Sequence, residues 1–281
     1  MALKIVTDST CDLPKSLIAE LGVTVLPCNL HIGDKTLLDG IDITSEEFYK
    51  RLAQGGPAPS TSQPSVGAFL DVYNKIGRPG DEILSLHISA KLSGTYNSAF
   101  QAAKEAQTKA KIAVVDGMTV SLVLGILVRE AAKIAKQGGT LKQATDFLAR
   151  EIPNIACYCS VDTLEYLVRG GRASRVQGFF GSLLDIKPII SVRDGEVHPV
   201  DRVRTRKRML ARLVEMAGEA KGLRALGVMH SACADEAAAL ADELGRHFPR
   251  KEVLICEFTP VMGAHLGPKA IGMGMWKGEA A

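Results

Sequence analysis

The chain has 281 residues, enough for one large domain or two of ordinary size. Apolar residues make up 46% of the chain and charged residues 23%, which is typical of a folded protein and excludes a disordered one. The net charge of +3 excludes a protein that is basic over its whole surface, as many nucleic-acid-binding proteins are. The longest apolar run, at residues 120–128, is far shorter than the ~20 residues that span a bilayer, so we expect no membrane insertion.

The cysteines indicate the redox environment. None of the six has the spacing of a metal ligand, and the start Met1-Ala2-Leu3-Lys4 lacks the pattern of a signal peptide. Cys157 and Cys159 would share one face of a strand, where two buried core thiols are more common than a redox or metal pair. We therefore expect a cytoplasmic protein with reduced thiols and no bound metal.

Strands and helices alternate through the first half of the chain. Thr44 and Glu47 have the spacing of a capping box at the start of a helix. Residues 57–64 are too rich in proline and hydroxyl groups for regular structure, so we expect a loop there. In chain order the expected elements are strand 3–7, helix 14–21, strand 23–32, helix 44–54, loop 57–64, a helix from there to 76, strand 82–88, helix 94–110, strand 112–116, helix 120–137 and helix 140–152.

The pattern changes near residue 155, where antiparallel pairing enters. Arg193-Asp194-Gly195, between two short apolar segments, is a hairpin signal. The expected elements are strand 155–161, a break at 170–172, strands 187–192 and 196–200, helix 205–220, strand 224–230, helix 235–247 and strand 252–259. We predict an α/β fold with an N-terminal domain, residues 1–155, whose parallel sheet carries helices on both faces, and a C-terminal α+β domain, residues 156–281.

Most common catalytic signatures are absent from the sequence. It has no G-x-x-x-x-G-K-[ST] phosphate loop, no G-x-S-x-G nucleophile elbow and no H-E-x-x-H zinc helix. The glycines of residues 272–278 superficially resemble a dinucleotide-binding fingerprint, but no room remains after them for the helix and second strand that such a fingerprint requires. We therefore expect no nucleotide cofactor at this segment.

Small polar residues are concentrated at two predicted helix starts. Thr61 and Ser62 precede one helix, and Ser93 and Gly94 precede another. Ligands bind at the carboxyl ends of parallel strands, and the unpaired N–H groups of a helix start attract anions. Two such starts with hydroxyl groups predict an anion site without a lysine, although ordinary helix capping is the more common explanation of either loop alone.

His265 lies in the segment Gly263-Ala264-His265-Leu266-Gly267, whose glycines predict a flexible loop close to neighbouring backbone. A lone histidine is most often structural. A His265 that reached the anion would donate a hydrogen bond when neutral and a charge-assisted one when protonated. The spacing alone leaves the identity of the anion open.

Seven segments in a fixed order make the sequence resemble the DegV family, which includes the fatty-acid-binding subunits of bacterial fatty acid kinase. The resemblance covers essentially the whole chain, and the segments are specific only in combination. They are Thr7-Asp8-Ser9-Thr10, Thr61-Ser62-Gln63-Pro64-Ser65, Leu92-Ser93-Gly94-Thr95-Tyr96-Asn97-Ser98-Ala99, Gly170-Gly171-Arg172, Lys187-Pro188-Ile189-Ile190, Val203-Arg204-Thr205-Arg206 and His265-Leu266-Gly267-Pro268.

The resemblance implies two domains with a long-chain fatty acid buried between them and no other cofactor. It places the carboxylate of the fatty acid on the hydroxyls of Thr61, Ser62 and Ser93. The Gly94 backbone and His265 would lie beside it, so that the last part of the chain returns to the ligand site.

Two basic features require separate interpretation. Lys269 stands where many members of the family have a small residue, which would add charge near the carboxylate. Residues 202–208 hold five basic side chains, for which a solvated helix face is the simplest interpretation. The resemblance implies a docking surface for the catalytic subunit of the kinase, with Arg202 in the contact. Nucleic-acid binding is the least supported interpretation, because the segment has no interleaved aromatic residues.

The favoured hypothesis is a carrier without enzymatic activity that presents the fatty acid carboxylate to a separate kinase, for use in phospholipid synthesis. The sequence has no nucleotide loop and no cluster of carboxylates for Mg²⁺, so phosphoryl transfer would belong to the partner. Two alternatives stay open. One is a hydrolase or phosphotransferase that uses Ser93 with His265, and the other is a sensor of small anions with the same site and no acyl tunnel.

Overall fold

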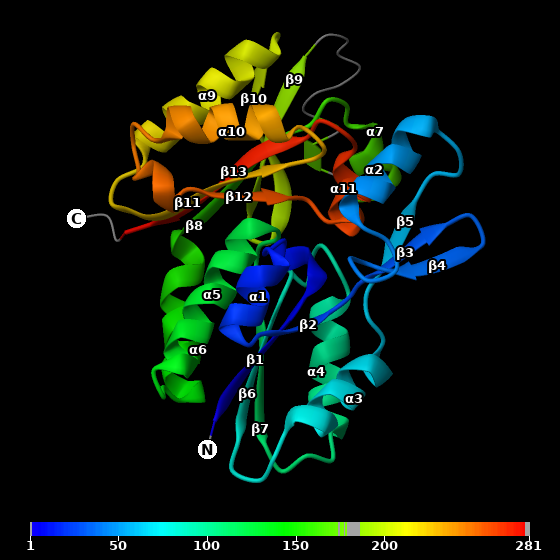
Figure 1. Ribbon diagram of the computed structural model, residues 1–281, viewed down its shortest axis with the longest axis vertical. Helices are drawn as coiled ribbons and strands as arrows, with labels where there is room; N and C mark the ends of the chain where they lie inside the picture. The colour runs from blue at the N-terminus through cyan, green and yellow to red at the C-terminus, as the bar shows by residue number, and fades with distance from the viewer. Residues whose placement is uncertain (1, 174, 177, 179–185, 279–281) are drawn as a thin grey trace.

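Three sheets organise the chain, whose computed structural model describes residues 2–173, 175, 176, 178 and 186–278 (Figure 1). The first sheet has four strands, all parallel, in the order β2-β1-β6-β7. These strands are β1 (Leu3–Asp8), β2 (Thr24–Leu26), β6 (Glu82–His87) and β7 (Lys111–Asp116).

Helices cover both faces of this first sheet. Neighbouring residues of a strand therefore pack into different cores: Ile5 joins the cluster that contains α5, whereas Val6 joins the cluster that contains α3 and α4. Burial on both sides explains why apolar residues follow one another directly in these strands, as Ile5 and Val6 do, instead of alternating with polar ones. One face carries α1 (Lys15–Leu21), α5 (Leu122–Lys136) and α6 (Leu141–Glu151), and the other carries α3 (Val66–Ile76) and α4 (Thr95–Glu105).

The second sheet has six strands in the order β10-β9-β8-β13-β11-β12, and all neighbours pair antiparallel except β11 with β12. Helices α9 (Arg206–Glu219) and α10 (Ala234–Leu244) pack on one of its faces. The strands are β8 (Ile155–Ser160), β9 (Lys187–Arg193), β10 (Glu196–Val203), β11 (Leu223–His230), β12 (Leu254–Glu257) and β13 (Ile271–Lys277). The predicted α/β fold class, with a parallel sheet followed by a mixed one, is confirmed.

Helix α5 lies between the two large sheets and contacts both β1 and β13. Glycines of the second sheet allow this approach. A Cβ atom at Gly227 would lie 2.3 Å from Leu122 Cδ2, and one at Gly274 would lie 2.8 Å from Val123 Cγ1. The first turn of α5 therefore packs directly on the backbone of β11 and β13. Of the glycines that resemble a dinucleotide fingerprint in the sequence, Gly272 and Gly274 thus belong to the central strand β13, where the lack of a side chain serves packing, and Gly278 follows that strand.

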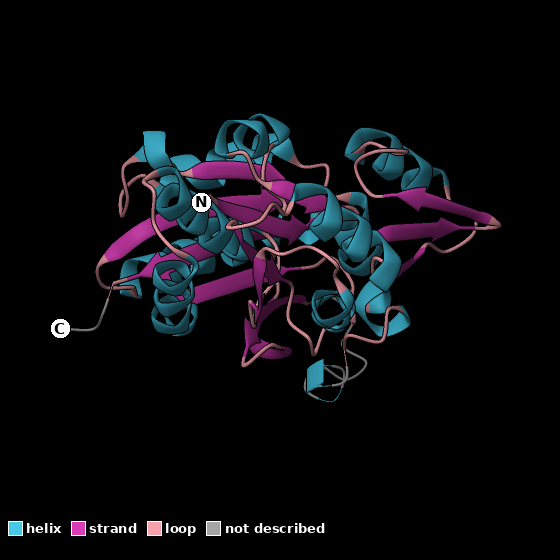
Figure 2. Cartoon of the chain, turned by 90° about the horizontal axis from the view of Figure 1, so that it is seen from below, coloured by secondary structure: helices cyan, strands magenta, loops and turns pink. Residues whose placement is uncertain are grey.

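A small antiparallel sheet projects to one side of the molecule, at the right of Figures 1 and 2. Its strands, in the order β4-β3-β5, are β3 (Asn29–Ile32), β4 (Lys35–Leu38) and β5 (Ser60–Ser62). Helix α2 (Ser45–Gln54) packs beside it and buries Phe48 and Tyr49 against α11 (Pro260–Leu266). The short helix α7 (Glu165–Arg169) also packs on α11.

Two predictions in this region are wrong. The expected strand 23–32 is two strands in different sheets, β2 and β3. Pro27, which has no N–H donor for a ladder hydrogen bond, lies between them and separates them. The expected loop 57–64 contains β5, whose three residues pair with β3. That pairing is a contact with a distant part of the chain, which local composition does not reveal.

Turn and cap predictions fare better. The predicted hairpin joins β9 to β10, and its turn residues Asp194 and Gly195 have φ values of 50° and 78°, as a type I′ turn requires. Thr44 accepts a hydrogen bond from the Glu47 N–H, but the Glu47 side chain pairs with Arg51, so only half of the expected capping box forms.

The domain boundary near residue 155 stays a prediction, since β8 begins there but α5 packs on both sheets.

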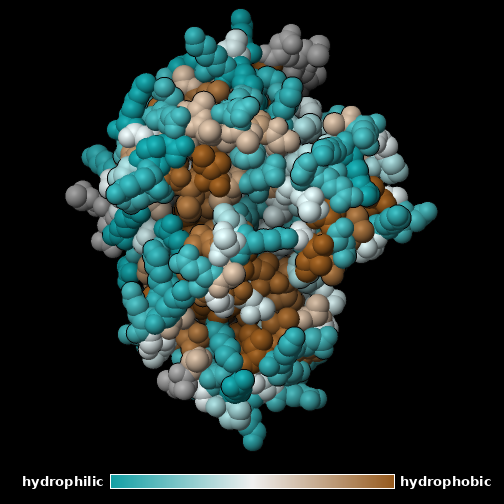
Figure 3. Space-filling model, in the orientation of Figure 1, coloured by the Kyte–Doolittle hydropathy of each residue, from teal (hydrophilic) through white to brown (hydrophobic). Residues whose placement is uncertain are grey.

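No helix among the described residues is long and apolar enough to cross a membrane. The face of the molecule in Figure 3 is largely hydrophilic and is broken by small apolar patches.

Candidate functional site

A cavity of about 850 Å³, counting the open space at its mouth, lies between the two large sheets. The apolar lining residues come from strands of the second sheet, from α7 and α11, and from loops that follow strands of both sheets. They are Cys28, Ile88, Leu92, Val120, Cys157, Cys159, Leu167, Ile190, Val192, Val197, Phe258, Val261, Met262 and Leu266. The polar lining residues are Thr10, Thr61, Ser62, Gln63, Ser93, Ser121, Arg172, Ser191 and His265.

The thiols of the cavity wall are buried, as predicted. Cys157 and Cys159 are free thiols that lie on one face of β8 and line the cavity. Burial raises the pKa of Cys157 to about 12 and raises the pKa of Cys159 well above its usual value. Both side chains are therefore protonated, apolar parts of the wall at neutral pH.

Thr61 and His265 meet at the polar part of the cavity. Thr61 lies on β5, where it pairs with Leu30, and its Oγ1 atom is 2.8 Å from His265 Nε2. His265 belongs to α11, so the prediction of a flexible glycine-lined loop is wrong. Gly263 is helical, and it permits close packing on α2, because a Cβ atom there would lie 2.7 Å from Phe48 Cε1.

His265 is neutral in this environment. Burial, with a smaller contribution from the Arg172 charge, lowers its pKa to about 4. A Cβ atom at Gly170 would lie 2.2 Å from His265 Nδ1, so the imidazole packs directly on the Gly170 backbone. His265 Nδ1 has no hydrogen-bond partner among the described residues. The ring therefore uses only Nε2 for hydrogen bonding.

Two buried carboxyl groups hold the start of α11. Asp12 accepts a hydrogen bond from the Thr259 N–H (3.0 Å), and Asp39 accepts one from the Val261 N–H (3.2 Å). Burial raises the pKa of Asp12 to about 7 and that of Asp39 to about 6. The helix that carries His265 is thus anchored by residues from the N-terminal part of the chain.

Ser93 and Gly94 lie beside the Thr61 strand. The Ser93 Oγ atom is 2.9 Å from Thr95 Oγ1 and accepts a hydrogen bond from the Thr95 N–H (3.3 Å). A Cβ atom at Gly94 would lie 2.9 Å from the Gln63 amide, so the side chain of Gln63 rests on the Gly94 backbone. The two helix starts singled out in the sequence therefore touch, although Gly94 itself does not line the cavity.

Ser62 lines the cavity, but its hydroxyl has partners of its own. The Asn29 amide donates to Ser62 Oγ (3.2 Å), and His31 Nε2 lies 2.9 Å from the same oxygen. Asn29 and His31 are on β3, opposite β5. They were not singled out in the sequence, where only their alternation on a strand beside a serine could have indicated a role.

Arg172 is a cationic residue of the cavity lining. It belongs to the segment Gly170-Gly171-Arg172, for which the sequence predicted no role in binding. Its Nε atom donates to the Leu92 carbonyl (3.1 Å), and its guanidinium also donates to the Gly170 carbonyl. Partial burial lowers its pKa, but an arginine guanidinium keeps its charge in proteins. Arg172 therefore places a positive charge close to Ser93 and His265.

The two other basic features lie elsewhere. Lys269 does not line the cavity but lies in a surface depression at the start of α10. The prediction that its charge lies near the bound carboxylate is therefore wrong. Arg202 is exposed on β10, and its guanidinium forms no ion pair with any described residue. Two of the five basic side chains of residues 202–208 are engaged locally, since Arg206 pairs with Glu236 and Arg208 with Glu215.

The arrangement does not favour a nucleophilic mechanism. A Ser93 nucleophile would need His265 as its base, yet the two side chains have other partners and no hydrogen bond joins them in the described structure. Over the same residues no group of three or more His, Cys, Asp or Glu side chains could hold a metal ion.

Comparison with known proteins identifies one family. A family model described as "Uncharacterised protein, DegV family" matches residues 2–277. A DegV domain-containing protein of Streptomyces coelicolor is 37% identical over 273 residues, which is 96% of each chain. A solved structure described as fatty acid binding of a DegV family protein from Thermus thermophilus is 34% identical, with a TM-score of 0.90 over 99% of this chain and 100% of that one. DegV from Bacillus subtilis, described as a fatty acid binding protein, is 29% identical, with a TM-score of 0.89 and the same coverage.

Proposed function

The chain belongs to the DegV family, and from that premise we propose that it binds a long-chain fatty acid in the cavity between the two large sheets. One observation carries the proposal: a largely apolar cavity is lined by the hydroxyl groups of Thr61 and Ser93, with His265 bonded to Thr61 and the charge of Arg172 in the same lining. A molecule with a long apolar tail and one anionic end matches this distribution.

The apolar walls account for most of the affinity. Burial of about fifteen methylene groups at roughly 0.8 kcal/mol each gives on the order of 12 kcal/mol before the costs of ordering and association. The walls are built from Leu, Ile, Val, Met and Cys side chains, with Phe258 as the aromatic member of the lining. Such walls suit a flexible acyl chain.

The donors orient the carboxylate. The neutral His265 ring avoids an unpaired, buried N–H at Nδ1 when its proton is on Nε2. In that tautomer the ring donates Nε2–H to Thr61 Oγ1, and the Thr61 proton is free for a ligand oxygen. Ser93 Oγ accepts from the Thr95 N–H and lies 2.9 Å from Thr95 Oγ1. When the Thr95 hydroxyl is the donor of that second bond, the Ser93 proton is free for the ligand as well. Two hydroxyl donors and the nearby Arg172 charge offset the cost of burying a carboxylate. Ser62 and the Gly94 backbone complete the proposed group, mainly as supports.

The proposed role is that of a carrier without enzymatic activity, which presents the carboxylate to the catalytic subunit of a fatty acid kinase for use in phospholipid synthesis. The free and exposed guanidinium of Arg202 supports a docking role for this side chain. We propose that phosphoryl transfer belongs to the partner, and the lack of a metal-holding group of His, Cys, Asp or Glu side chains among the described residues is consistent with this division of roles.

Identification of the bound lipid tests the proposal. Protein purified from bacteria, extracted with organic solvent and analysed by mass spectrometry is expected to release a saturated or unsaturated acid of about 14–18 carbons, the length that the family resemblance implies. Absence of any acyl lipid, together with no heat of binding for added hexadecanoic acid, would refute it. Turnover of acyl esters or ATP that disappears in Ser93→Ala would instead favour the enzymatic alternative.

A further inference from the structure

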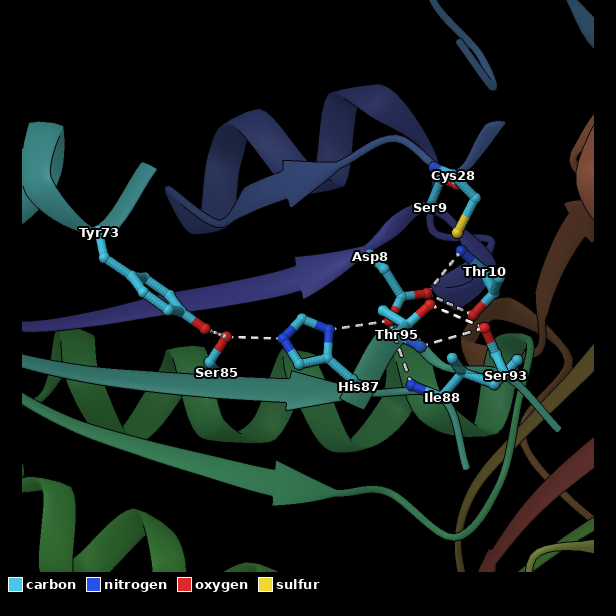
Figure 4. Close-up of polar contacts among 10 residues, drawn as sticks. All are labelled: Asp8, Ser9, Thr10, Cys28, Tyr73, Ser85, His87, Ile88, Ser93 and Thr95. Atoms are coloured by element: carbon cyan, nitrogen blue, oxygen red, sulfur yellow. Dashed lines mark hydrogen bonds and ion pairs between the residues drawn. The ribbon is translucent and has the colours of Figure 1, made fainter. Parts of the chain in front are cut away.

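A chain of four buried polar side chains runs through the core of the first sheet (Figure 4). The Tyr73 hydroxyl donates to Ser85 Oγ (2.8 Å), Ser85 Oγ lies 2.6 Å from His87 Nε2, and His87 Nδ1 lies 2.9 Å from Asp8 Oδ2. All four residues are 0% exposed. Ser85 and His87 share one face of β6, Asp8 ends the neighbouring strand β1, and Tyr73 comes from α3.

This chain has the order of groups found in serine hydrolases, yet it is not a nucleophilic site. Ser85, His87 and Asp8 are connected as the serine, histidine and aspartate of a catalytic triad are. The Tyr73 hydroxyl, however, occupies the side of Ser85 Oγ that a substrate would need. None of the four side chains lines the cavity. A structural role therefore has to explain why so many polar groups are buried here.

The hydrogen bonds of the chain have one consistent direction. Asp8 is an acceptor, so His87 carries its proton on Nδ1 and donates to it. His87 Nε2 is then an acceptor and receives the Ser85 proton, while Ser85 accepts from Tyr73. Every donor of the chain is used when the protons point from Tyr73 toward Asp8. The opposite direction would leave the Tyr73 proton without an acceptor inside the core.

The Asp8 end of the chain reaches the cavity. The Asp8 carboxylate also accepts hydrogen bonds from Thr10 N–H (3.1 Å), Thr10 Oγ1 (2.5 Å) and Ile88 N–H (3.1 Å). Thr10 and Ile88 both line the cavity. The loop that holds Ser93 follows Ile88 in the sequence. The Asp8 carboxylate therefore fixes the ends of β1 and β6 at the cavity wall.

The Tyr73 end of the hydrogen-bonded chain leads to the segment that holds Thr61. Tyr73 lies on α3, which begins directly after the Thr61–Ser62–Gln63 segment and is capped by Ser65. The Phe69 ring of the same helix packs edge-on against the His87 ring, with centroids 5.0 Å apart. The buried chain thus connects α3 with β6 and β1, the three elements next to the proposed donors.

From this geometry we infer that Asp8 is a positioning residue for the ligand of the cavity, held in one orientation by the chain Tyr73–Ser85–His87. The inference rests on the proposed function, because it assumes that the cavity binds a fatty acid. Asp8 touches no ligand itself; it sets the positions of Thr10 and Ile88, which do line the site.

The test compares the affinity of delipidated protein for hexadecanoic acid, by calorimetry, among four variants. Asp8→Asn replaces one acceptor oxygen by a donor and is expected to weaken binding about tenfold, comparable to the loss of one buried charge-assisted hydrogen bond. Tyr73→Phe removes only the far donor and is expected to weaken binding about threefold. The double variant should bind no more weakly than Asp8→Asn, since Tyr73 acts through Asp8. Trp276→Phe, which deletes a buried hydrogen bond to Glu151 far from this chain, is the control and should stay within twofold of the unchanged protein.

Nitrogen NMR of the histidine side chains gives an independent readout. His87, identified by comparison with His87→Gln, should carry its proton on Nδ1 in the unchanged protein and in Tyr73→Phe. A proton on Nε2 would overturn the inferred direction of the chain. So would unchanged affinity in both Asp8→Asn and Tyr73→Phe, or losses that multiply in the double variant. If Asp8→Asn does not fold, Tyr73→Phe decides, because equal affinity to the Trp276→Phe control would overturn the inference. Failure of the unchanged protein to bind would overturn the proposed function and this inference together.

Discussion

Thr61 Oγ1 lies 2.8 Å from His265 Nε2, although 204 positions separate the two residues in the sequence. The contact joins the small projecting sheet to α11, near the other end of the chain. The donors of the proposed ligand site therefore depend on the tertiary structure, and their individual contributions can be tested by single substitutions.

Loss of a donor should weaken fatty acid binding without unfolding the protein. Thr61→Val and Ser93→Ala each remove one hydroxyl, and each is expected to raise the dissociation constant for hexadecanoic acid about tenfold. Ser60→Ala, on the same strand as Thr61 but exposed, is the matched control. Calorimetric titration measures the effect, and affinities that stay equal to the control would contradict the proposed donor group.

A larger side chain in the wall should exclude the acyl tail. Cys159→Leu adds bulk on the face of β8 that lines the cavity, so we expect at least tenfold weaker binding of hexadecanoic acid while the melting temperature is kept or raised. Cys233→Leu makes the same chemical change at a half-buried cysteine outside the cavity. Equal affinities of these two variants would indicate that the tail lies elsewhere.

Stability should depend on pH through Asp12 and Asp39, whose pKa values burial raises to about 7 and about 6. A carboxyl group with a raised pKa binds its proton more tightly in the folded state. Its stabilising contribution is complete below the unfolded-state pKa of about 4 and is lost as the pH rises through the folded-state value. Urea unfolding from pH 4 to pH 8 should show Asp12→Asn gaining on the order of 2–4 kcal/mol relative to the unchanged protein. A difference that is constant over this range would show that Asp12 does not titrate as proposed.

Docking to a kinase should depend on Arg202 and leave the lipid in place. Arg202→Glu reverses an exposed charge, so we expect unchanged affinity for hexadecanoic acid and at least tenfold slower phosphorylation of the bound acid by a fatty acid kinase catalytic subunit. Lys207→Glu reverses another exposed charge of the same segment and serves as the control. If lipid binding is lost in Arg202→Glu, the residue is structural instead.

Glycine positions in the central strand should tolerate no side chain. A Cβ atom at Gly272 would lie 2.3 Å from the Tyr158 carbonyl oxygen and 3.0 Å from Cys159 Cα, so Gly272→Ala is expected to lower the free energy of unfolding by roughly 1–3 kcal/mol. In Gly67→Ala, on helix α3, the nearest atom would be 3.7 Å away, and this variant should gain about 0.5–1 kcal/mol. Denaturant unfolding of the two variants measures both effects, and a stable Gly272→Ala would disprove the packing argument.

Local signals in the sequence predicted the elements that depend on local physics. The Asp194-Gly195 turn forms because both residues take positive φ values, and Thr44 caps α2 because its hydroxyl reaches an N–H three residues later. The hydroxyl groups at two helix starts indicated an anion site for the same reason, and the structure brings Thr61 and Ser93 to one cavity.

Contacts between distant segments decided the rest. Strand β5 forms in a proline-rich segment because β3 supplies its hydrogen-bond partners. His265 is helical because Gly263 lets α11 pack against α2. Arg172 acquires its place from carbonyl groups of Leu92 and Gly170, which composition and spacing do not connect with a ligand. Each of these features requires a partner whose position only the folded chain supplies.

Helix α5 has apolar contacts with strands on both of its sides, and one continuous core includes Leu84 of the first large sheet, Val123 of the helix and Met229 of the second. Cutting the chain near residue 155 would strip this helix of half its neighbours and expose them to water. The two halves are therefore expected to melt in one cooperative transition, and a protease that nicks the connection should release no independently folded fragment.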